Sequence, residues 1–259
     1  MIKVEKVDVW GFEHAIRGMR NPMNSWDKSD SFSCADRLTC EGCPCEGVDD
    51  TCNSTVEMEN VIVGQNDLDL MRRLYRAGTE HRKYLRQVFV SMDITAPLYW
   101  WKEFDTYRVG TVANSCSTMH KIHAKEFELD DFSHEHLFGD FEPIERRSAT
   151  DYEVIFNTNN IILKSDTVLM CIIECLNFYR EMYLKTKNKD YWWQMIQLLP
   201  SSYNQRRTVA MNYENVATII KQRTGHKLDE WNEFVTMLKT LPYVKQITEE
   251  TGTGDLIRA

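Results

Sequence analysis

The segment of residues 87–122 constrains the fold more strongly than any other part of the 259-residue chain. Its first part alternates apolar and polar side chains, with apolar residues at Val88, Val90, Met92 and Ile94. This spacing is the period of a half-buried β-strand. Pro97 then suits the first turn of a helix, where its missing N–H would have had no partner. A strand is therefore predicted to lead into a helix that ends near Gly110, followed by a polar loop, Asn114-Ser115-Cys116-Ser117-Thr118.

The composition is that of an ordinary globular protein, with 27% charged and 42% hydrophobic residues. The formal net charge of −8 argues against bulk electrostatic binding of nucleic acid or of an anionic membrane, although it allows one local basic pocket. No stretch approaches the roughly 20 apolar residues of a membrane span. The start of the chain carries charges where a signal peptide needs an apolar run. A cytoplasmic protein without membrane association is expected.

Periodicity predicts the remaining elements of an α+β fold. A strand is expected over residues 3–9, and helices are expected over residues 12–19, 66–77, 166–185 and 190–199. Asn66 is expected to cap its helix and Gly78 to end it. Residues 124–158 show no clear period, and a surface excursion is the main expectation for them. The chain is expected to form a single domain, residues 1–259.

Residues 31–55 are expected to form a cysteine-rich insert in this domain. It contains five of the eight cysteines: Cys34, Cys40, Cys43, Cys45 and Cys52. The spacing Cys40-x-x-Cys43 lets two thiolates bind one metal ion from a tight turn, and the other cysteines could complete a tetrahedral zinc site. A reduced loop, or a disulfide formed only on isolation, is the alternative. Elsewhere, Cys171 and Cys175 stand four residues apart on a predicted helix, where core packing is favoured over metal binding.

The central segment resembles the signature of an enzyme family. Ala96-Pro97 opens the predicted helix, Thr106-Tyr107-Arg108 follows it, and Cys116 comes after seven further residues. Flavin-dependent thymidylate synthases have a strand, an Ala-Pro-initiated helix, an Arg-His-Arg triplet, seven residues and a serine. The segment is similar to this signature, with one of the three triplet residues kept and a cysteine in place of the serine.

A second set of residues matches the same family in order and spacing. Leu199-Pro200 is followed by Asn212, by Arg223 eleven residues later, and then by His226 and Trp231. The family has a Leu-Pro at a helix end, a short strand, an asparagine that opens a helix, an arginine eleven residues on, a histidine and a tryptophan. With the first strand, the resemblance covers roughly half of the chain.

The resemblance implies an α+β fold with a mostly antiparallel sheet flanked by long helices, assembled as a homotetramer. It implies FAD as the cofactor, a folate as the one-carbon donor and NADPH. The implied reaction transfers a one-carbon unit to C5 of a pyrimidine nucleotide, dUMP or a related one, as in a thymidylate synthase-like methyltransferase of nucleotide biosynthesis. The alternative is a catalytically altered or inactive member of the fold that acts as a zinc-stabilised binding or assembly protein.

The resemblance also implies site residues, with catalytic roles for Cys116 and Arg223. An arginine facing a pyrimidine can stabilise negative charge that develops on the ring, and a cysteine can orient the ring or attack C6. The residues expected to bind the cofactor are Tyr107, Arg108, Asn114, Asn212 and His226. The residues expected to bind the substrate are Glu103, Ser115, Ser117, Arg206 and Arg223.

The sequence departs from the family at several charged positions. Arginines of the family are replaced by Thr118, Ile196 and Glu214. Two of those arginines hold the nucleotide phosphate in the family, and Arg86-Gln87 replaces a Glu-His pair that helps to hold flavin. Arg206 and Arg207 could compensate for the lost charge; otherwise the substrate is not dUMP in the usual pose.

Three of the functional interpretations have a purely structural alternative. Arg223 could be a helix-end arginine that pairs with Asp229 or Glu230, and Cys116 could be a buried packing residue. Residues 20–31 are polar and rich in turn residues. They form either a surface connection or a cofactor-contacting loop, since the family places an arginine and a serine after its first helix.

Overall fold

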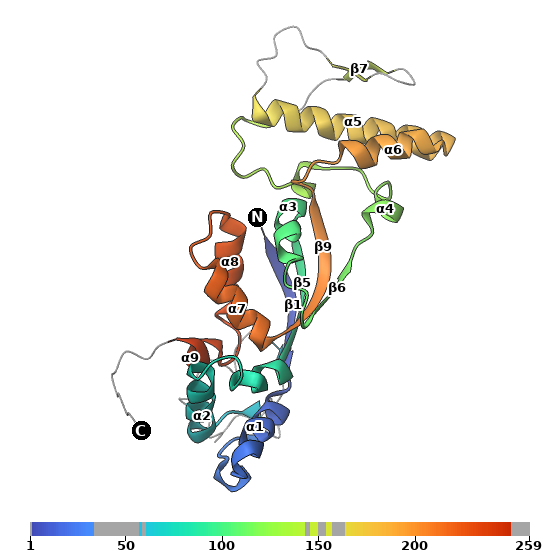
Figure 1. The fold of residues 1–259 in the computed structure, drawn as a ribbon. Coiled ribbons are helices and arrows are strands. Elements are labelled where there is room, and N and C mark those ends of the chain that lie inside the picture. Colours follow the sequence, from blue (N-terminus) through green and yellow to red (C-terminus); the bar gives the residue numbers. More distant parts are fainter. Residues whose placement is uncertain are drawn as a thin grey trace, which may run out of the picture. The chain divides into compact units, whose positions relative to one another are not determined.

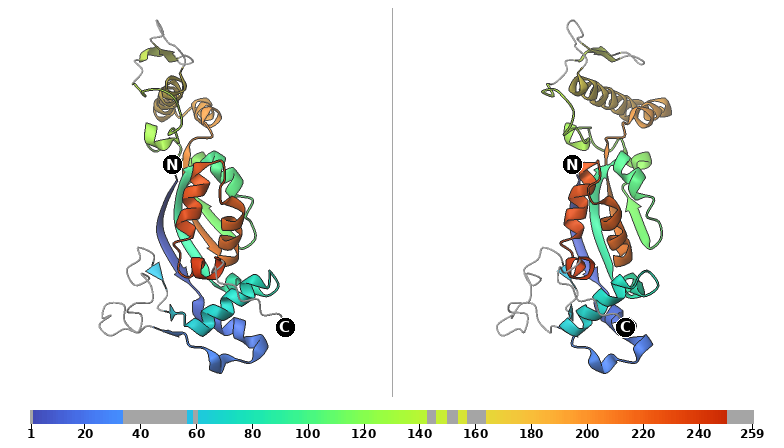
Figure 2. Two further views of the ribbon diagram at one scale, coloured as in Figure 1. Left: turned by 90° about the vertical axis from the view of Figure 1, so that its left-hand side faces the viewer. Right: turned by 60° about the vertical axis from the view of Figure 1, so that its left-hand side comes forward.

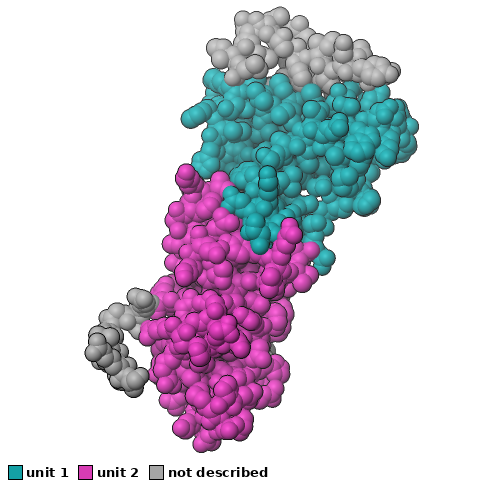
Figure 3. Space-filling model, viewed as in Figure 1, with its two compact units in different colours: residues 1–3, 94–106, 114–207 teal, residues 4–93, 107–113, 208–259 magenta. Residues whose placement is uncertain are grey.

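The structure is a computed structural model that describes residues 2–33, 57–58, 61–142, 146–149, 154–156 and 164–249. Its contacts divide the chain into two compact units (Figure 3). Unit 1 comprises residues 1–3, 94–106 and 114–207, and unit 2 comprises residues 4–93, 107–113 and 208–259.

A five-stranded sheet, with the strand order β3-β1-β5-β9-β6, is the main β-structure (Figure 1). Its strands are β3 (Glu57–Met58), β1 (Lys3–Trp10), β5 (Phe89–Pro97), β9 (Asn204–Asn212) and β6 (Thr111–Ser115). Two small antiparallel pairs join β2 (Phe32–Ser33) to β4 (Val61–Ile62) and β7 (Arg146–Ala149) to β8 (Val154–Phe156). The predicted α+β class, with a mostly antiparallel sheet and flanking helices, is confirmed, although β1 and β3 pair in parallel.

The predicted alternation of the central strand is confirmed in β5. Val90, Met92, Ile94 and Ala96 are fully buried, while the residues between them are partly exposed. Alternate burial is what a strand with one face on the core requires, because successive side chains point to opposite faces.

Helices of unit 2 cover the ends and faces of its strands. They are α1 (Phe12–Arg20), α2 (Gln65–Arg76), α7 (Tyr213–Arg223), α8 (Asp229–Leu238) and α9 (Val244–Thr248), with the 3₁₀ helices η1 (Asn21–Met23), η2 (Trp26–Lys28) and η4 (Arg82–Gln87). α7 and α8 pack side by side (Figure 2). Buried apolar residues on both helices, Val216, Ile219, Trp231 and Phe234, hold this pair in the core.

Unit 1 has its own hydrophobic core. Its helices are α3 (Leu98–Phe104), α4 (Thr118–Lys121), α5 (Ser165–Thr186) and α6 (Lys189–Leu198), with the 3₁₀ helix η5 (Leu129–Asp131). The predicted apolar stripe on α5 packs in this core through Leu169, Ile173 and Leu176, together with Ile122, Phe127, Phe132 and Met195. None of the described helices is long and apolar enough to cross a membrane.

Several local predictions are wrong for identifiable reasons. The helix after Pro97 ends at Phe104 and not near Gly110, and Asn114 and Ser115 belong to strand β6 and not to a loop. The surface excursion predicted for residues 124–158 is wrong at Phe127 and Phe132, which are buried against α5. Their burial was hidden because the partner helix lies far along the chain.

The predicted cap of α2 is also wrong. Gly64 takes the N-cap position, and the backbone N–H of Asn66 donates to a carboxylate oxygen of Asp30 at 2.9 Å. The carboxylate satisfies a first-turn N–H that a local side chain would otherwise cap. By contrast, Asn212 opens α7 as predicted, since its Oδ1 accepts from the backbone N–H of Asn215 at 3.0 Å.

A close approach at Gly110 ties this helix start to the turn before β6. Asn215 Nδ2 donates to the Val109 carbonyl at 2.7 Å and to Thr111 Oγ1 at 2.8 Å. Gly110 has φ +76°, and a Cβ atom added there would collide with the side-chain nitrogen of Asn212. Only glycine allows both this backbone conformation and this contact.

We therefore expect Gly110→Ala to lower the free energy of unfolding by about 2 kcal/mol, from backbone strain plus overlap with Asn212. Urea unfolding followed by circular dichroism measures the change. Gly225→Ala is the matched control, because Gly225 has φ +72° but no atom within 4 Å of an added Cβ. The control should lose only about 1 kcal/mol. Equal losses in the two variants would contradict the close approach.

Candidate functional site

Arg223, the last residue of α7, lies among aromatic side chains of unit 2. Its Nε donates to the Tyr107 hydroxyl at 2.9 Å. Its guanidinium carbon lies 4.5 Å from the ring centre of Trp231 and 5.6 Å from that of Tyr107. Both distances are within the range of cation–π attraction. The half-buried guanidinium is therefore oriented by one hydrogen bond and two aromatic rings.

His226 also contacts Arg223. Arg223 Nη1 lies 3.1 Å from His226 Nε2, and the backbone N–H of Leu228 lies 3.2 Å from His226 Nδ1. Arginine can only donate, so the first contact needs the imidazole proton on Nδ1, whereas the second needs it on Nε2. A single neutral imidazole satisfies one of these contacts at a time. The tautomer of His226 therefore decides whether it holds Arg223.

Tyr107 links Arg223 to its neighbour on the helix. The Tyr107 hydroxyl donates to Gln222 Oε1 at 2.9 Å while it accepts from Arg223. The next residues of this segment, in unit 2, lie at the surface: Arg108 is exposed, and Val109 and Val112 are 88% and 67% exposed. This segment therefore combines a cation with bare apolar surface.

Glu214 stands where the family resemblance places an arginine. It forms an ion pair with Arg82, in which Arg82 Nη2 lies 2.9 Å from Glu214 Oε1 and both side chains are mostly buried. Arg82 also lies over the ring of Tyr75, 5.2 Å from its centre. The second carboxylate oxygen of Glu214 is buried without a hydrogen-bond partner among the described residues. The charge reversal at this position is therefore matched by Arg82.

Cys116 and its neighbours form a separate group in unit 1. The Cys116 side chain is exposed, so the packing alternative for this residue is wrong. Its backbone N–H donates to the Arg206 carbonyl at 2.9 Å, and its carbonyl accepts from Gln205 Nε2 at 3.0 Å. Ser117 caps α4, because its Oγ accepts from the backbone N–H of His120 at 3.0 Å. The thiol is thus held at the surface on a fixed backbone, and Asn114 and Ser115 are exposed beside it in sequence.

The two arginines expected to compensate for lost positive charge differ in their surroundings. Arg207 Nη1 lies 2.7 Å from Asp105 Oδ1, its Nε donates to Gln205 Oε1 at 2.9 Å, and its guanidinium lies 4.2 Å from the ring centre of Trp101. These contacts hold the Arg207 side chain against other residues of unit 1. Arg206 is exposed, and Glu103 is half-buried at the end of α3.

The structure therefore brings the predicted residues together in two groups. Tyr107, Arg223 and His226 meet in unit 2 at the C-terminal end of α7, the helix that Asn212 caps at its other end. Ser115, Cys116, Ser117 and Arg206 meet in unit 1. Sequence reasoning missed the pairs Tyr107–Gln222 and Arg82–Glu214, because nothing in the local spacing links residues more than a hundred positions apart.

The predicted metal ligands Cys34, Cys40, Cys43, Cys45 and Cys52 lie outside the described residues. Within the part of the chain that the structure describes, no group of three or more His, Cys, Asp or Glu side chains could hold a metal ion. The zinc site in the cysteine-rich insert stays a prediction.

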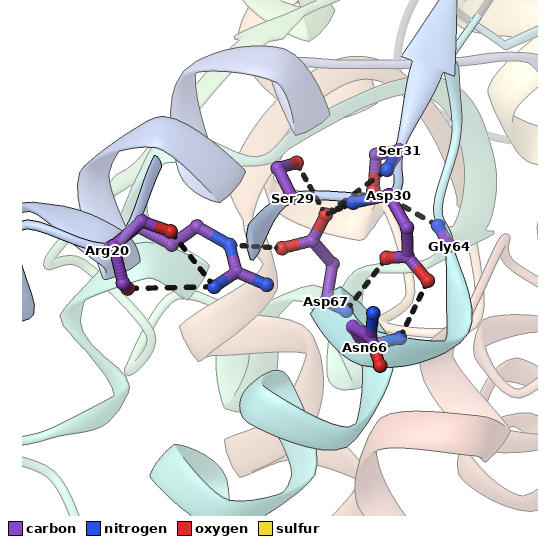
Figure 4. A network of polar contacts seen from close by, with 8 residues as sticks. Arg20, Ser29, Asp30, Ser31, Gly64, Asn66 and Asp67 are labelled. Atoms are coloured by element: carbon purple, nitrogen blue, oxygen red, sulfur yellow. Dashed lines mark hydrogen bonds and ion pairs between the residues drawn. The ribbon is translucent and has the colours of Figure 1, made fainter. Parts of the chain in front are cut away.

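The polar segment after α1 is held by one buried carboxylate (Figure 4). Asp67 on α2 accepts from Arg20 Nε at 2.6 Å, from Ser29 Oγ at 2.6 Å and from Ser31 Oγ at 2.7 Å. It also accepts from the backbone N–H groups of Asp30 and Ser31. Five donors around one carboxylate tie residues 20–31, which contain the short 3₁₀ helices η1 and η2, to α2.

A hollow of about 370 Å³ lies beside this network in unit 2. Its walls combine the apolar side chains of Ile16, Trp26 and Phe32 with the polar side chains of Arg17, Arg20 and Ser29. Trp26 is half exposed, although its indole N–H donates to Asn21 Oδ1 at 2.8 Å. A cofactor-contacting loop at residues 20–31 stays a prediction that this mixed lining favours.

The fold is that of the flavin-dependent thymidylate synthases. One similar structure is thymidylate synthase X (ThyX) from Helicobacter pylori with FAD and dUMP, at a TM-score of 0.58 and 16% identity, covering 96% of this chain and 98% of that one. Another is the UMP/dUMP methylase PolB from Streptomyces cacaoi bound with 5-Br UMP, at a TM-score of 0.54 and 14% identity, covering 95% and 92% of the two chains. No protein-family profile and no curated protein matches the sequence.

Replacing Asp67 should test the network and its pH dependence. Burial raises the pKa of Asp67, but the hydrogen bonds from Ser29, Ser31 and Arg20 outweigh it, so the pKa lies below its ordinary value of 3.8. The stabilisation is therefore complete above about pH 4 and is lost as pH falls through the lowered pKa. We expect Asp67→Asn to cost about 3 kcal/mol at pH 7, because it leaves Arg20 buried without its counter-charge.

Urea unfolding at pH 7 and pH 3 measures this effect, and the difference between the native chain and Asp67→Asn should narrow at pH 3. Asp69→Asn is the matched control on the same helix, because the Asp69 side chain is 55% exposed in its pair with Arg72. The control should change the free energy of unfolding by less than about 0.5 kcal/mol. A loss in Asp67→Asn no larger than in this control would refute the role of Asp67.

The three described cysteines should differ in their reactivity toward iodoacetamide. Cys116 is exposed, whereas Cys171 and Cys175 are half-buried on α5. Burial, followed by the nearby charge of Glu174, raises the pKa of the Cys171 thiol; burial, followed by Cys171 and Glu174, raises that of Cys175. Because the thiolate is the reacting form, we expect Cys116 to be labelled roughly tenfold faster at pH 8. Peptide mass spectrometry measures the rates, and urea-unfolded protein, in which the three rates should converge, is the control. Equal rates in the folded protein would contradict the assignment.

Proposed function

We propose that the protein is a flavin-dependent enzyme that transfers a one-carbon unit from a folate to C5 of a pyrimidine nucleotide. The observation that carries the proposal is the position of Arg223. It lies eleven residues after the asparagine that opens α7, and Tyr107, His226 and Trp231 surround it. The fold supports the proposal, because the similar ThyX structure contains FAD and dUMP and the PolB structure contains 5-Br UMP.

The described residues fit a flavin cofactor in their chemistry. An isoalloxazine ring needs apolar contact, and the pyrophosphate of FAD needs cations or backbone N–H donors. Residues 107–113 of unit 2 offer both, because Arg108 is exposed beside the bare side chains of Val109 and Val112. Gly110 lets the backbone of this segment approach a neighbouring group closely. Arg108, Asn114, Asn212 and His226 are the residues that we propose to hold FAD.

When bound, FAD would supply hydride transfer in the reaction, with NADPH as the source of the hydride. The protein's own residues would bind and orient the pyrimidine and stabilise its charge. When a nucleophile adds to C6, or when C5 loses its proton, negative charge develops on the oxygens of the ring, and a fixed guanidinium lowers the energy of that state. Arg223 suits this role, since its aromatic neighbours and the Tyr107 hydroxyl orient it before any ligand binds.

Cys116 has the second proposed role. Its thiol is exposed on a backbone that Arg206 and Gln205 fix. It can orient the edge of the pyrimidine by hydrogen bonding, or its thiolate can add to C6 and leave again after C5 has lost its proton. Glu103, Ser115, Ser117 and Arg206 are proposed to contact the nucleotide.

Nucleotide recognition is expected to differ from that of the family. Of the family's arginine positions that are substituted here, Glu214 is paired with Arg82 and Thr118 is uncharged. Arg207 is engaged by Asp105 and lies over Trp101. Arg206, which is exposed, is the proposed phosphate contact. A single such contact favours weaker phosphate binding, so UMP, dUMP and modified pyrimidine nucleotides are all substrates to be compared.

Assembly as a homotetramer is also proposed. α5 buries Leu169, Ile173 and Leu176 in unit 1, but apolar side chains on its other sides stay at the surface, among them Val168 at 44% and Leu184 at 37% exposure. On α6, Trp193 and Leu198 are 41% and 42% exposed. A helix with apolar residues on several sides is more typical of one covered by a partner.

The activity itself provides the test. The protein should bind FAD, detected as quenching of flavin fluorescence. With NADPH and methylene-tetrahydrofolate it should release tritium from [5-³H]dUMP or [5-³H]UMP, because the C5 hydrogen is replaced. Arg223→Gln should slow this release by about a hundredfold, the usual cost of removing one donor to a developing oxyanion. Lys221→Gln, an exposed cation two residues earlier on α7, should leave the rate unchanged.

The outcomes separate the candidate functions. No FAD binding at micromolar concentrations would rule out a flavoenzyme. FAD binding without tritium release from any pyrimidine nucleotide would favour an altered member of the fold that binds but does not catalyse. An Arg223→Gln variant as active as Lys221→Gln would remove Arg223 from the site.

A further inference from the structure

A second hollow of unit 2, of about 690 Å³, lies on the outer side of α2, apart from the Arg223 cluster. Its lining consists of charged and polar side chains with one apolar residue, Leu70. The cations are Arg20, Lys28, Arg72, Arg73 and Arg76, and the only carboxylate in the lining is Asp69. Two of the five cations are paired with carboxylates, Arg20 with Asp67 and Arg72 with Asp69. With these pairs counted, the surface still carries an excess of positive charge on a chain whose net charge is −8.

The helical periodicity of α2 places its basic side chains on one face. Asp69, Arg72, Arg73 and Arg76 follow the spacing i, i+3, i+4 and i+7, so they share one helix face. Leu68 and Met71 are buried on the side of the helix that packs in the core. Arg72 is held on this face, because its Nε donates to the Gln246 carbonyl at 2.7 Å and its Nη1 pairs with Asp69 at 3.0 Å. Arg73 and Arg76 stand beside it, and the helix rises by about 6 Å between Arg72 and Arg76.

One cation in the lining of the hollow, Arg20, is buried and held by hydrogen bonds. Arg20 is only 4% exposed, and it is held by Asp67 through Nε and by the Ser25 carbonyl through Nη1 at 3.1 Å. Figure 4 shows the third guanidinium nitrogen without a dashed line to any residue drawn. A buried cation fixed in this way provides a donor whose position does not have to be ordered when a ligand binds.

We propose that this hollow binds the di- or triphosphate group of a nucleotide. Guanidinium groups suit phosphates because their paired N–H groups match two phosphate oxygens. Among the described residues the lining contains no aromatic side chain on which a base could stack, so the recognised group is the phosphate chain and not the base. A bounded hollow holds a short polyphosphate, whereas a nucleic acid needs a long basic path, which the net charge disfavours.

The site is distinct from the proposed pyrimidine site, and its occupant would carry more phosphates than a nucleoside monophosphate. The site would bind a nucleoside di- or triphosphate through residues 20–76, none of which belongs to the Arg223 cluster. The two sites can therefore be tested separately on the full chain.

Isothermal titration of the full-length protein with inorganic tripolyphosphate is the direct test. We expect saturable binding with one site per chain, weakened roughly tenfold in Lys28→Gln/Arg73→Gln, since that variant removes two charged contacts. Both residues are exposed, so the variant should fold normally. Lys164→Gln/Lys185→Gln is the matched control, because it removes two exposed positive charges from unit 1 and should bind tripolyphosphate like the native protein.

Two further measurements identify the ligand class and locate its site. Arg223→Gln should bind tripolyphosphate normally, which separates this proposal from the proposed catalytic function. dTTP should compete with tripolyphosphate, whereas a thymidine oligonucleotide should compete poorly. No binding of tripolyphosphate, or equal weakening by the two double variants, would overturn the proposal. Tighter binding of the oligonucleotide than of tripolyphosphate would overturn the assigned ligand class.

Discussion

The close approach between Gly110 and Asn212 is the constraint on which the candidate site of unit 2 depends. The backbone N–H of Asn212 donates to the Gly110 carbonyl at 3.3 Å, and the same asparagine caps α7. Tyr107 lies three residues before this contact in the chain, and Arg223 lies eleven residues after it. The contact fixes the segment of Tyr107 against the start of α7. Arg223 lies at the other end of the same helix, where its side chain meets that of Tyr107.

Around this constraint, charge is rearranged relative to the family pattern. An arginine at position 214 would face Arg82 as a like charge, so Glu214 and Arg82 are a consistent pair and not two independent changes. In unit 1, Arg207 pairs with Asp105 and stacks on Trp101. Glu214 and Arg207 thus take part in ion pairs within their own units.

The sequence predicts the parts of this structure that depend on local periodicity. The alternation from Val88 onward and the cap at Asn212 are such cases, because neighbours in sequence determine them. Prediction fails where a residue far along the chain determines a cap or the burial of a side chain. Asp30 takes the place of a local cap for α2, and Phe127 is buried because α5 covers it. The polar network around Asp67 joins residues 20–31 to a helix more than thirty positions away, and no local spacing announces it.

The Tyr107 hydroxyl has one hydrogen, which it donates to Gln222. It accepts from Arg223 and donates to Gln222, so the hydrogen bonds run in one direction, from the guanidinium through the phenol to the amide oxygen. A phenol engaged in this way has no proton to give to a bound ring unless Gln222 first turns away. Tyr107 is therefore a poor general acid despite its position, and a proton that enters or leaves the site must travel by another group or by water.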